Sequence, residues 1–301
     1  MKGLVLGIAL FVAISFLSLT AVLAYEEAPV SGGGSVSGKI TFKGTPPPPK
    51  LFDFAKFPQQ SYCSKADSDE LGHRILREVK VKDGALGDVV VFIEGIEKGK
   101  AFKFNGTDVN ADTCRFLVQG GPSTMVGVVM NRNEIRVTNK DADPSDSKSA
   151  DGVLHNPHGY EVSMSWIIRW EQSSSGVIHY SHGYEVKGNA SRTLFNKPLP
   201  TKGMVLTQKL ILRRPKRFMM IQCDQHNYMN AWFHPVDNPY YAIVGEDGKF
   251  SIDDIPPGSY EIYAFHPILG TNEQKLTVTA GGKASVNFEF SKPPWMLRPK
   301  P

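Results

Sequence analysis

A cysteine, a histidine and a methionine stand close together after an apolar stretch in the last third of the chain. Cys223, His226 and Met229 are separated by two residues each, and residues 218–221 before them read Phe-Met-Met-Ile. An apolar strand would deliver the thiol, and the short loop after it would bring the imidazole and the thioether to the same point. A soft thiolate, an imidazole and a weak thioether are three of the four donors that a trigonal type 1 copper site uses. The spacing therefore predicts a copper site that needs one more imidazole from elsewhere in the chain.

The missing imidazole has two candidate sources, because two near-identical segments lie upstream. Residues 153–162 read Val-Leu-His-Asn-Pro-His-Gly-Tyr-Glu-Val, and residues 177–186 read Val-Ile-His-Tyr-Ser-His-Gly-Tyr-Glu-Val. His179, in the second copy, is nearer to the cysteine in sequence. His155, in the first copy, is followed by an asparagine, whose short amide can hold a ligating ring, whereas the tyrosine after His179 cannot. We therefore expect His155 to be the ligand and keep His179 as the alternative.

The ligand pattern resembles that of the cupredoxins, the family of plastocyanin and amicyanin. The shortest ligand loop of that family is Cys, two residues, His, two residues, Met, as in the loop that begins at Cys223. Its remote histidine is commonly followed by asparagine, as His155 is by Asn156. The resemblance implies an exported type 1 copper protein that carries single electrons.

The resemblance also implies a role for each residue. Cys223 and two imidazoles would form the plane around one copper ion, and Met229 would be the long axial ligand. Asn156 would tie the two ligand segments together near the sulfur, and His158 would lie beside the site or at the surface. His226 would present its ring edge to solvent and pass the electron.

Other chemistries fit this residue set less well. Zinc would accept the thiolate and imidazoles, but structural zinc sites rarely use methionine, and catalytic ones need an open position with a base beside it. Asp224 suits a loop-capping acceptor better than a general base. We find no pair of nucleophile and base, so we do not expect an enzyme. The alternative hypothesis is a non-redox β-sandwich that serves as a binding or structural module with an empty or degenerate metal site.

The start of the chain predicts export. After Met1 and Lys2, residues 3–24 are apolar or small and end in Val-Leu-Ala, the pattern of a secretory signal peptide. We therefore expect a periplasmic or extracellular protein. It would be tethered to the membrane if this segment is not cleaved, since the segment is long enough to span a bilayer.

Three cysteines in an exported chain indicate one disulfide and one thiol with another use. Cys63 and Cys114 have no histidine or second cysteine at ligand spacing and are the expected pair, which would stabilise the fold by about 2–4 kcal/mol. Cys223 is left free, and in an oxidising compartment a free thiol favours metal ligation.

The elements that position these residues are strands. Helical periodicity is nearly absent, and short alternating segments between Gly, Pro, Asn and Asp turns predict an all-β protein of the sandwich type. The clearest expected strands are residues 35–42, 88–93, 134–139, 204–212, 218–223, 259–265 and 284–290. The two histidine copies and the alternating stretch at 164–170 between them are expected to form an inserted hairpin.

Segments far apart in the chain resemble the transthyretin-like module of carboxypeptidase regulatory domains. Residues 36–44 are similar to its opening strand, residues 86–95 to its inner strand, and residues 245–260, with their Pro-Pro-Gly turn, to its closing half. The two resemblances together imply a cupredoxin-type Greek-key sandwich inserted in, or packed beside, a transthyretin-like β-sandwich. The expected division is a signal peptide (1–24), a linker (25–33), the carboxypeptidase regulatory-like sandwich (34–98 plus 239–291), the copper domain (99–238) and a C-terminal tail (292–301).

Charge adds little to the prediction of partners. The net charge of +4 is spread thinly, and the dense basic cluster at residues 213–217 is typical of a solvated turn between strands. Because aromatic and basic residues do not interleave, we do not expect a nucleic-acid partner. The implied partners are redox proteins such as cytochromes or a periplasmic oxidoreductase.

Overall fold

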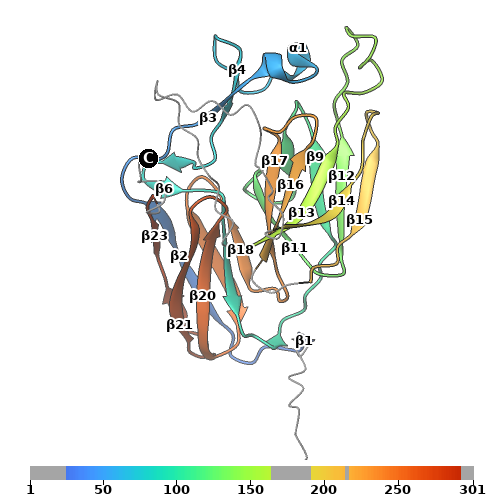
Figure 1. Ribbon diagram of the computed structural model, residues 1–301. Helices are drawn as coiled ribbons and strands as arrows, with labels where there is room; N and C mark the ends of the chain where they lie inside the picture. Colours follow the sequence, from blue (N-terminus) through green and yellow to red (C-terminus); the bar gives the residue numbers. More distant parts are fainter. Residues whose placement is uncertain (1–24, 164–190, 214–216, 293–301) are drawn as a thin grey trace, which may run out of the picture.

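The computed structural model describes residues 25–163, 191–213 and 217–292 of the chain. These residues form strands with two single-turn helical segments, so the all-β prediction is confirmed. They build two β-sandwiches that lie side by side (Figure 1). Among the described residues, no helix has the length and apolar character needed to cross a bilayer. The expected signal peptide, residues 1–24, lies outside the described residues.

The first sandwich joins segments from both ends of the chain. Its larger sheet has the order β19-β2-β6-β5, with β22 and β23 also paired to β2, and its smaller sheet has the order β18-β7-β20-β21. The strands are β2 (Gly34–Phe42), β5 (Val81–Lys82), β6 (Ala85–Leu86), β7 (Val89–Glu94), β18 (Tyr241–Val244), β19 (Lys249–Ile255), β20 (Gly258–His266), β21 (Gly270–Val278), β22 (Lys283–Ser285) and β23 (Phe288–Phe290). The expected order of turn, strand, Pro-Pro-Gly turn and strand in residues 245–260 is observed in β19 and β20.

The second sandwich contains the predicted ligand loop. One sheet has the order β10-β9-β12-β15 and the other has the order β11-β17-β16-β13-β14. The strands are β9 (Thr107–Ala111), β10 (Phe116–Val118), β11 (Val126–Val129), β12 (Glu134–Asn139), β13 (Pro157–Ser163), β14 (Ser191–Asn196), β15 (Val205–Lys209), β16 (Arg217–Cys223) and β17 (Asn230–Pro235). β13 and β14 pair antiparallel and flank the expected hairpin, most of which lies outside the described residues.

Two short strand pairs and two helical turns complete the structure. They are β1 (Glu26–Glu27) with β8 (Lys98–Gly99), β3 (Lys50–Asp53) with β4 (His73–Leu76), the 3-10 turn η1 (Phe54–Lys56) and the α-helical turn α1 (Gln60–Cys63). The expected boundaries placed the β3–β4 segment in the first sandwich. Its buried residues Phe52, Phe54 and Cys63 instead pack in the core of the second sandwich. This segment, residues 50–76, therefore covers the second sandwich and is called the cap below.

Strand β16 packs against apolar residues on both of its faces. Met219, Ile221 and Cys223 point into the core of the second sandwich, while Phe218 and Met220 belong to the core that is shared with the first sandwich. The Phe218 ring lies 5.4 Å from that of Phe265 in β20. A strand that is buried on both faces reads as a continuous apolar run, which explains the Phe-Met-Met-Ile sequence before the cysteine.

The close packing of β2 generates a stability prediction. A Cβ atom built on Gly38 would lie 1.6 Å from the carbonyl oxygen of Val286, so Gly38→Ala must push two backbones apart. We expect it to lower the free energy of unfolding by about 1–3 kcal/mol, measured by denaturant titration. Ser37→Ala on the same strand, whose side chain is exposed, is the control and should change stability little. Equal stability of the two variants would contradict the close approach of Gly38 to Val286.

Candidate metal centre

The ligand loop closes tightly after β16. Cys223, the last residue of the strand, donates its N–H to the carbonyl oxygen of Met229 at 3.1 Å. The N–H of Met229 in turn donates to the carbonyl of His226 at 2.8 Å. These two backbone bonds fold residues 224–228 back over the strand end. The short spacing of the three residues therefore produces the local turn that the sequence predicted.

The register of β13 brings the first histidine copy to the same place. Pro157 in β13 pairs with Cys223, so the residues just before β13 lie beside the thiol. His155 is held there by reciprocal backbone bonds with Leu199, and the N–H of Asn156 donates to the Cys223 sulfur at 3.3 Å. The carbonyl of Asn156 also accepts from the N–H of Asp224 at 3.1 Å. Asn156 thus ties the two segments together, mainly through its backbone.

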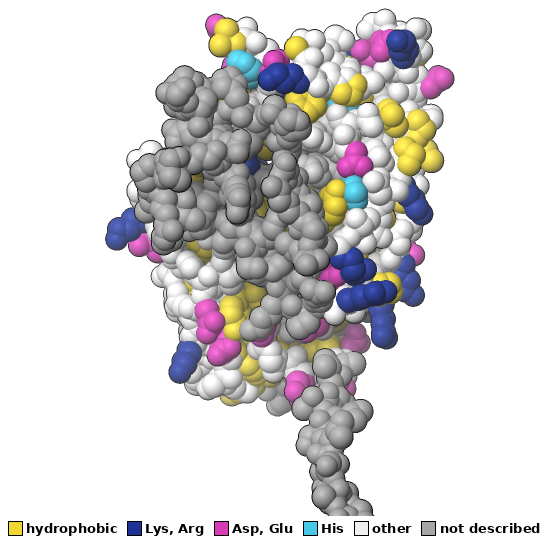
Figure 2. All heavy atoms as spheres, in the orientation of Figure 1, with side chains coloured by type: hydrophobic (Ala, Val, Ile, Leu, Met, Phe, Trp, Pro, Cys, Tyr) yellow, Lys and Arg dark blue, Asp and Glu magenta, His cyan; other side chains and the backbone are white. Residues whose placement is uncertain are grey.

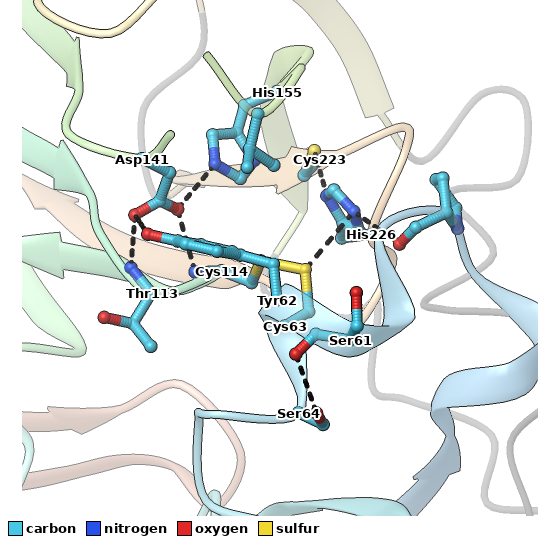
Figure 3. Close-up of a disulfide and its surroundings, with 12 residues drawn as sticks. Ser61, Tyr62, Cys63, Ser64, Thr113, Cys114, Asp141, His155, Cys223 and His226 are labelled. Carbon is cyan, nitrogen blue, oxygen red and sulfur yellow. Dashed lines mark hydrogen bonds and ion pairs between the residues drawn. A yellow bond between two sulfur atoms is a disulfide. The ribbon is translucent and has the colours of Figure 1, made fainter. Parts of the chain in front are cut away.

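Three donors converge in the interior of the second sandwich. One nitrogen of His155, one nitrogen of His226 and the sulfur of Cys223 all lie within 4.8 Å of one another. All three residues are fully buried, and Nδ1 of His226 is 3.7 Å from the sulfur. Nδ1 of His155 is buried and has no hydrogen-bond partner of standard geometry among the described residues. Figure 3 shows the two rings and the thiol facing a common point.

The outer nitrogen of His155 is held by a buried carboxylate that the sequence did not reveal. Nε2 of His155 lies 2.8 Å from Oδ2 of Asp141, which is itself fully buried. Asp141 also accepts hydrogen bonds from the N–H groups of Thr113 and Cys114, at 2.6 and 2.9 Å, and from the Tyr62 hydroxyl at 3.0 Å. No local motif marks this aspartate, because the partners of its carboxylate lie at least 14 residues away in the chain. The contact fixes the orientation of the His155 ring.

The outer nitrogen of His226 is covered by the cap. Nε2 of His226 is 3.2 Å from the carbonyl oxygen of Pro58 and 3.6 Å from the sulfur of Cys63. Cys63 and Cys114 form the predicted disulfide, with 5.3 Å between their Cα atoms. The expectation that His226 presents an edge to solvent is therefore wrong, because α1 and the segment before it bury the ring completely. Figure 3 shows the disulfide directly beside this ring.

The structure places the remaining candidates in different surroundings. Met229 is buried at the end of the loop, in the same core as the three donors. Its role as axial ligand stays a prediction. His158 points away from the thiol and lies among Asp224, Tyr160 and Asn196 near the surface. His179 lies outside the described residues, so its role as the alternative ligand stays untested.

The electrostatics of the site favour a thiolate. Burial acts to raise the pKa of Cys223, but interactions with His155 and His226 outweigh it and lower the pKa to about 6. Burial acts to lower the pKa of His155, but interactions with Asp141 and Cys223 outweigh it and raise the pKa to about 9. Between these values the metal-free site holds a negative sulfur next to a positive imidazole. The sulfur is thus prepared as a donor at neutral pH.

We expect the Cys223 thiol of the metal-free protein to lose its proton near pH 6 instead of the ordinary value of 9.0. Thiolate absorbance in the ultraviolet should therefore fall as the pH drops through about 6. Cys223→Ser should abolish this signal, because the other two cysteines form the disulfide. A midpoint near the ordinary value would show that the two imidazoles do not act on the sulfur.

Asp141→Asn should lower the pKa of His155 from its raised value of about 9, because an amide does not stabilise the imidazolium as a carboxylate does. The change also disturbs the hydrogen bonds from the backbone N–H groups of Thr113 and Cys114, the second of which is buried, so we expect a loss of about 1–3 kcal/mol of stability. NMR titration of the metal-free protein measures the first effect, and denaturant unfolding measures the second. Asp143→Asn, two residues away, is the control, since Asp143 bonds Ser145 instead. An unchanged His155 pKa in Asp141→Asn would refute the role assigned to the carboxylate.

Sequence comparisons match a limited part of the chain. A family model described as fn3_3, polysaccharide lyase family 4, domain II, matches residues 226–286, which run from the ligand loop into the first sandwich. This family differs from the carboxypeptidase regulatory family that the sequence suggested, and that resemblance is not supported here. No curated protein matches the chain.

Among solved structures, several forms of amicyanin are similar to part of the chain. A reduced Cu(I) form of one amicyanin mutant and the oxidized state of another are each 13% identical to this chain, with a TM-score of 0.24. Each alignment covers 48% of this chain and 98% of the amicyanin chain. BcpA, the major pilin subunit of Bacillus cereus, is 9% identical over 87% of this chain and 100% of its own, with a TM-score of 0.13. The functional assignment therefore rests on the geometry of the site.

Proposed function

We propose that this chain is a type 1 copper protein that carries single electrons. The observation that carries the proposal is the convergence of the Cys223 sulfur with one nitrogen each of His155 and His226, all buried and within 4.8 Å of one another. A thiolate with two imidazoles is the equatorial donor set of such sites. Met229, from the same loop, would supply the weak axial thioether.

The surroundings of the donors support a bound metal ion. The buried Nδ1 of His155 lacks a hydrogen-bond partner among the described residues, and a buried polar atom in this state calls for a ligand. The other nitrogen of each ring already has a partner: Nε2 of His155 lies next to Asp141, and Nε2 of His226 lies next to the Pro58 carbonyl. Each ring is therefore held by a contact on its outer side, as metal-ligating imidazoles usually are. A soft thiolate favours copper or zinc over hard cations, and a thioether favours copper over zinc.

The residues of the chain would create a rigid, dry site. Complete burial of the three donors excludes water, and the backbone bonds of Asn156 and Met229 to Cys223 resist movement of the loop. Copper bound there would supply one-electron exchange between Cu(II) and Cu(I). A site that is held in one shape by its surroundings reorganises little, which suits an electron carrier and not a catalyst. The proposal therefore includes no enzymatic activity.

The path of the electron to a partner must differ from the expected one, because His226 is covered. Asp224 follows Cys223 in the chain, and its side chain is about one-third exposed. It bonds His158 at 3.1 Å and Asn196 at 2.9 Å, which forms a polar cluster at the surface next to the thiol. We propose that redox partners, such as cytochromes or a periplasmic oxidoreductase, approach at this cluster. Figure 2 shows acidic and basic side chains interspersed on the face of the molecule that it draws.

The proposed location of the protein and the proposed role of the first sandwich follow from this function. The signal-like residues 1–24 would direct the chain to the periplasm or the exterior, where the disulfide is stable. The first sandwich would act as a scaffold that covers the outer face of β16. Nucleic acid has no part in the proposal.

Copper loading tests the proposal directly. We expect protein loaded with Cu(II) to show an intense visible absorption from thiolate-to-copper charge transfer. Cys223→Ser and His155→Ala should each remove this absorption, because each takes away an equatorial donor. His158→Ala is the matched control, since this ring of the same segment bonds Asp224 and not the thiol.

The same measurement separates the alternatives. If His179→Ala removes the colour and His155→Ala leaves it, the assignment passes to the second histidine copy. A wild-type protein that stays colourless and copper-free after loading would exclude the carrier function. The chain would then be the non-redox β-sandwich that serves as a binding or structural module.

A further inference from the structure

A cavity opens beside the ligand loop. It has a volume of about 420 Å³ and lies between the cap, the start of β10 and residues 228–230. Its size falls within the range of small-molecule sites in proteins. Tyr228 separates it from the candidate metal centre, since this ring packs edge-on against Phe54 and Phe57 and lies 5.8 Å from the His226 ring.

The walls of this cavity are strongly basic. Arg74, Arg77, Lys80 and Arg115 line it, together with a single carboxylate, Asp67. Arg74 is 4% exposed and pairs with Asp67 at 3.0 Å. Lys80 pairs with Asp88 at 3.1 Å. Among the described residues, neither Arg77 nor Arg115 forms an ion pair with a carboxylate. The cavity therefore holds an excess of positive charge that its own side chains do not neutralise.

The pKa of Asp67 agrees with this excess of positive charge in the cavity. Burial acts to raise it, but Arg74, and with smaller effects Arg115 and Lys80, hold it below its ordinary value. Three cations from different segments thus act on one point of the cavity wall. A negative group placed there would be stabilised by all of them.

Buried donors in the wall lack partners. Nε of Arg74, Nε of Arg115 and the hydroxyl of Tyr228 are all buried without a hydrogen-bond partner among the described residues, as is the acceptor Oδ1 of Asn230. Tyr228 is 1% exposed, so bulk water does not satisfy its hydroxyl. Leaving a buried donor unpaired costs about 1–3 kcal/mol, and the partial positive charge of these donors adds to that of the cations in the wall.

We infer that this cavity binds a small oxyanion, either free phosphate or the phosphate group of a small organic molecule. Planar guanidinium groups, such as those of Arg77 and Arg115, match the oxygens of such a group. A cavity larger than the anion itself leaves room for an organic remainder. This function is distinct from copper binding. Met229, the proposed axial ligand, also lines the cavity, but the contacts proposed for the anion come from the basic side chains.

The test is calorimetric titration of the metal-free, full-length protein with inorganic phosphate and, separately, with glycerol phosphate. We expect saturable binding at one site, and tighter binding of glycerol phosphate would identify an organic ligand. Arg115→Gln should weaken binding by roughly tenfold, because it removes a charged donor. Arg77→Gln, at an exposed position, should act in the same direction without disturbing the fold. Asp67→Asn should tighten binding, since it removes the opposing carboxylate.

The control is Lys275→Gln, which removes a positive charge from an exposed position on β21 in the first sandwich. Its affinity for phosphate should equal that of the unmodified protein. The inference is overturned if neither anion binds saturably, if Arg115→Gln and Arg77→Gln bind as tightly as the unmodified protein, or if Lys275→Gln weakens binding as much as they do. Because the titration uses metal-free protein, its outcome does not depend on whether the chain binds copper.

Discussion

Strand β16 is buried on both faces, and the candidate site depends on this. One face packs into the core of the second sandwich and the other into the core shared with the first sandwich. A strand whose side chains are closely packed on each face has little freedom to shift, since a slip of one residue would break the packing on both faces. The thiol at its end is therefore held at a fixed point. The register of the antiparallel partner β13 places His155 and Asn156, which directly precede that strand, beside the same point.

Around the donors, a buried carboxylate and a disulfide connect the cap to the candidate site. Asp141 joins the His155 ring to the turn that holds Cys114, and Cys114 is bonded to Cys63 in the cap. The cap in turn supplies the Pro58 carbonyl to the His226 ring. One continuous chain of contacts thus encloses both imidazoles. Because this enclosure also buries the edge of the His226 ring, the proposed electron path runs through the Asp224 cluster instead.

The ligand loop faces two chemically different environments. On its inner side lie the soft donors, in a dry apolar core. On its outer side, Tyr228 and Asn230 line a cavity with an excess of cations. Met229, which lies between these two residues, is buried in the core and also lines the cavity. An anion in the cavity and a metal ion in the core would therefore contact the same short segment.

Much of the fold was predictable from the sequence, because it depends on local patterns. Period-two alternation and turn residues identified strands such as β12 and β20, and the closing turn of the first sandwich followed from its Pro-Pro-Gly sequence. The spacing of Cys223, His226 and Met229 alone predicted a tight loop with soft donors. An odd cysteine count separated the Cys63–Cys114 pair from the free thiol. The tertiary structure decided the partner of His155, the burial of His226 and the place of the β3–β4 segment over the second sandwich. Asp141 and Pro58 reach the site from distant loops, and no local spacing encodes a contact that depends on how separate strands and loops pack together.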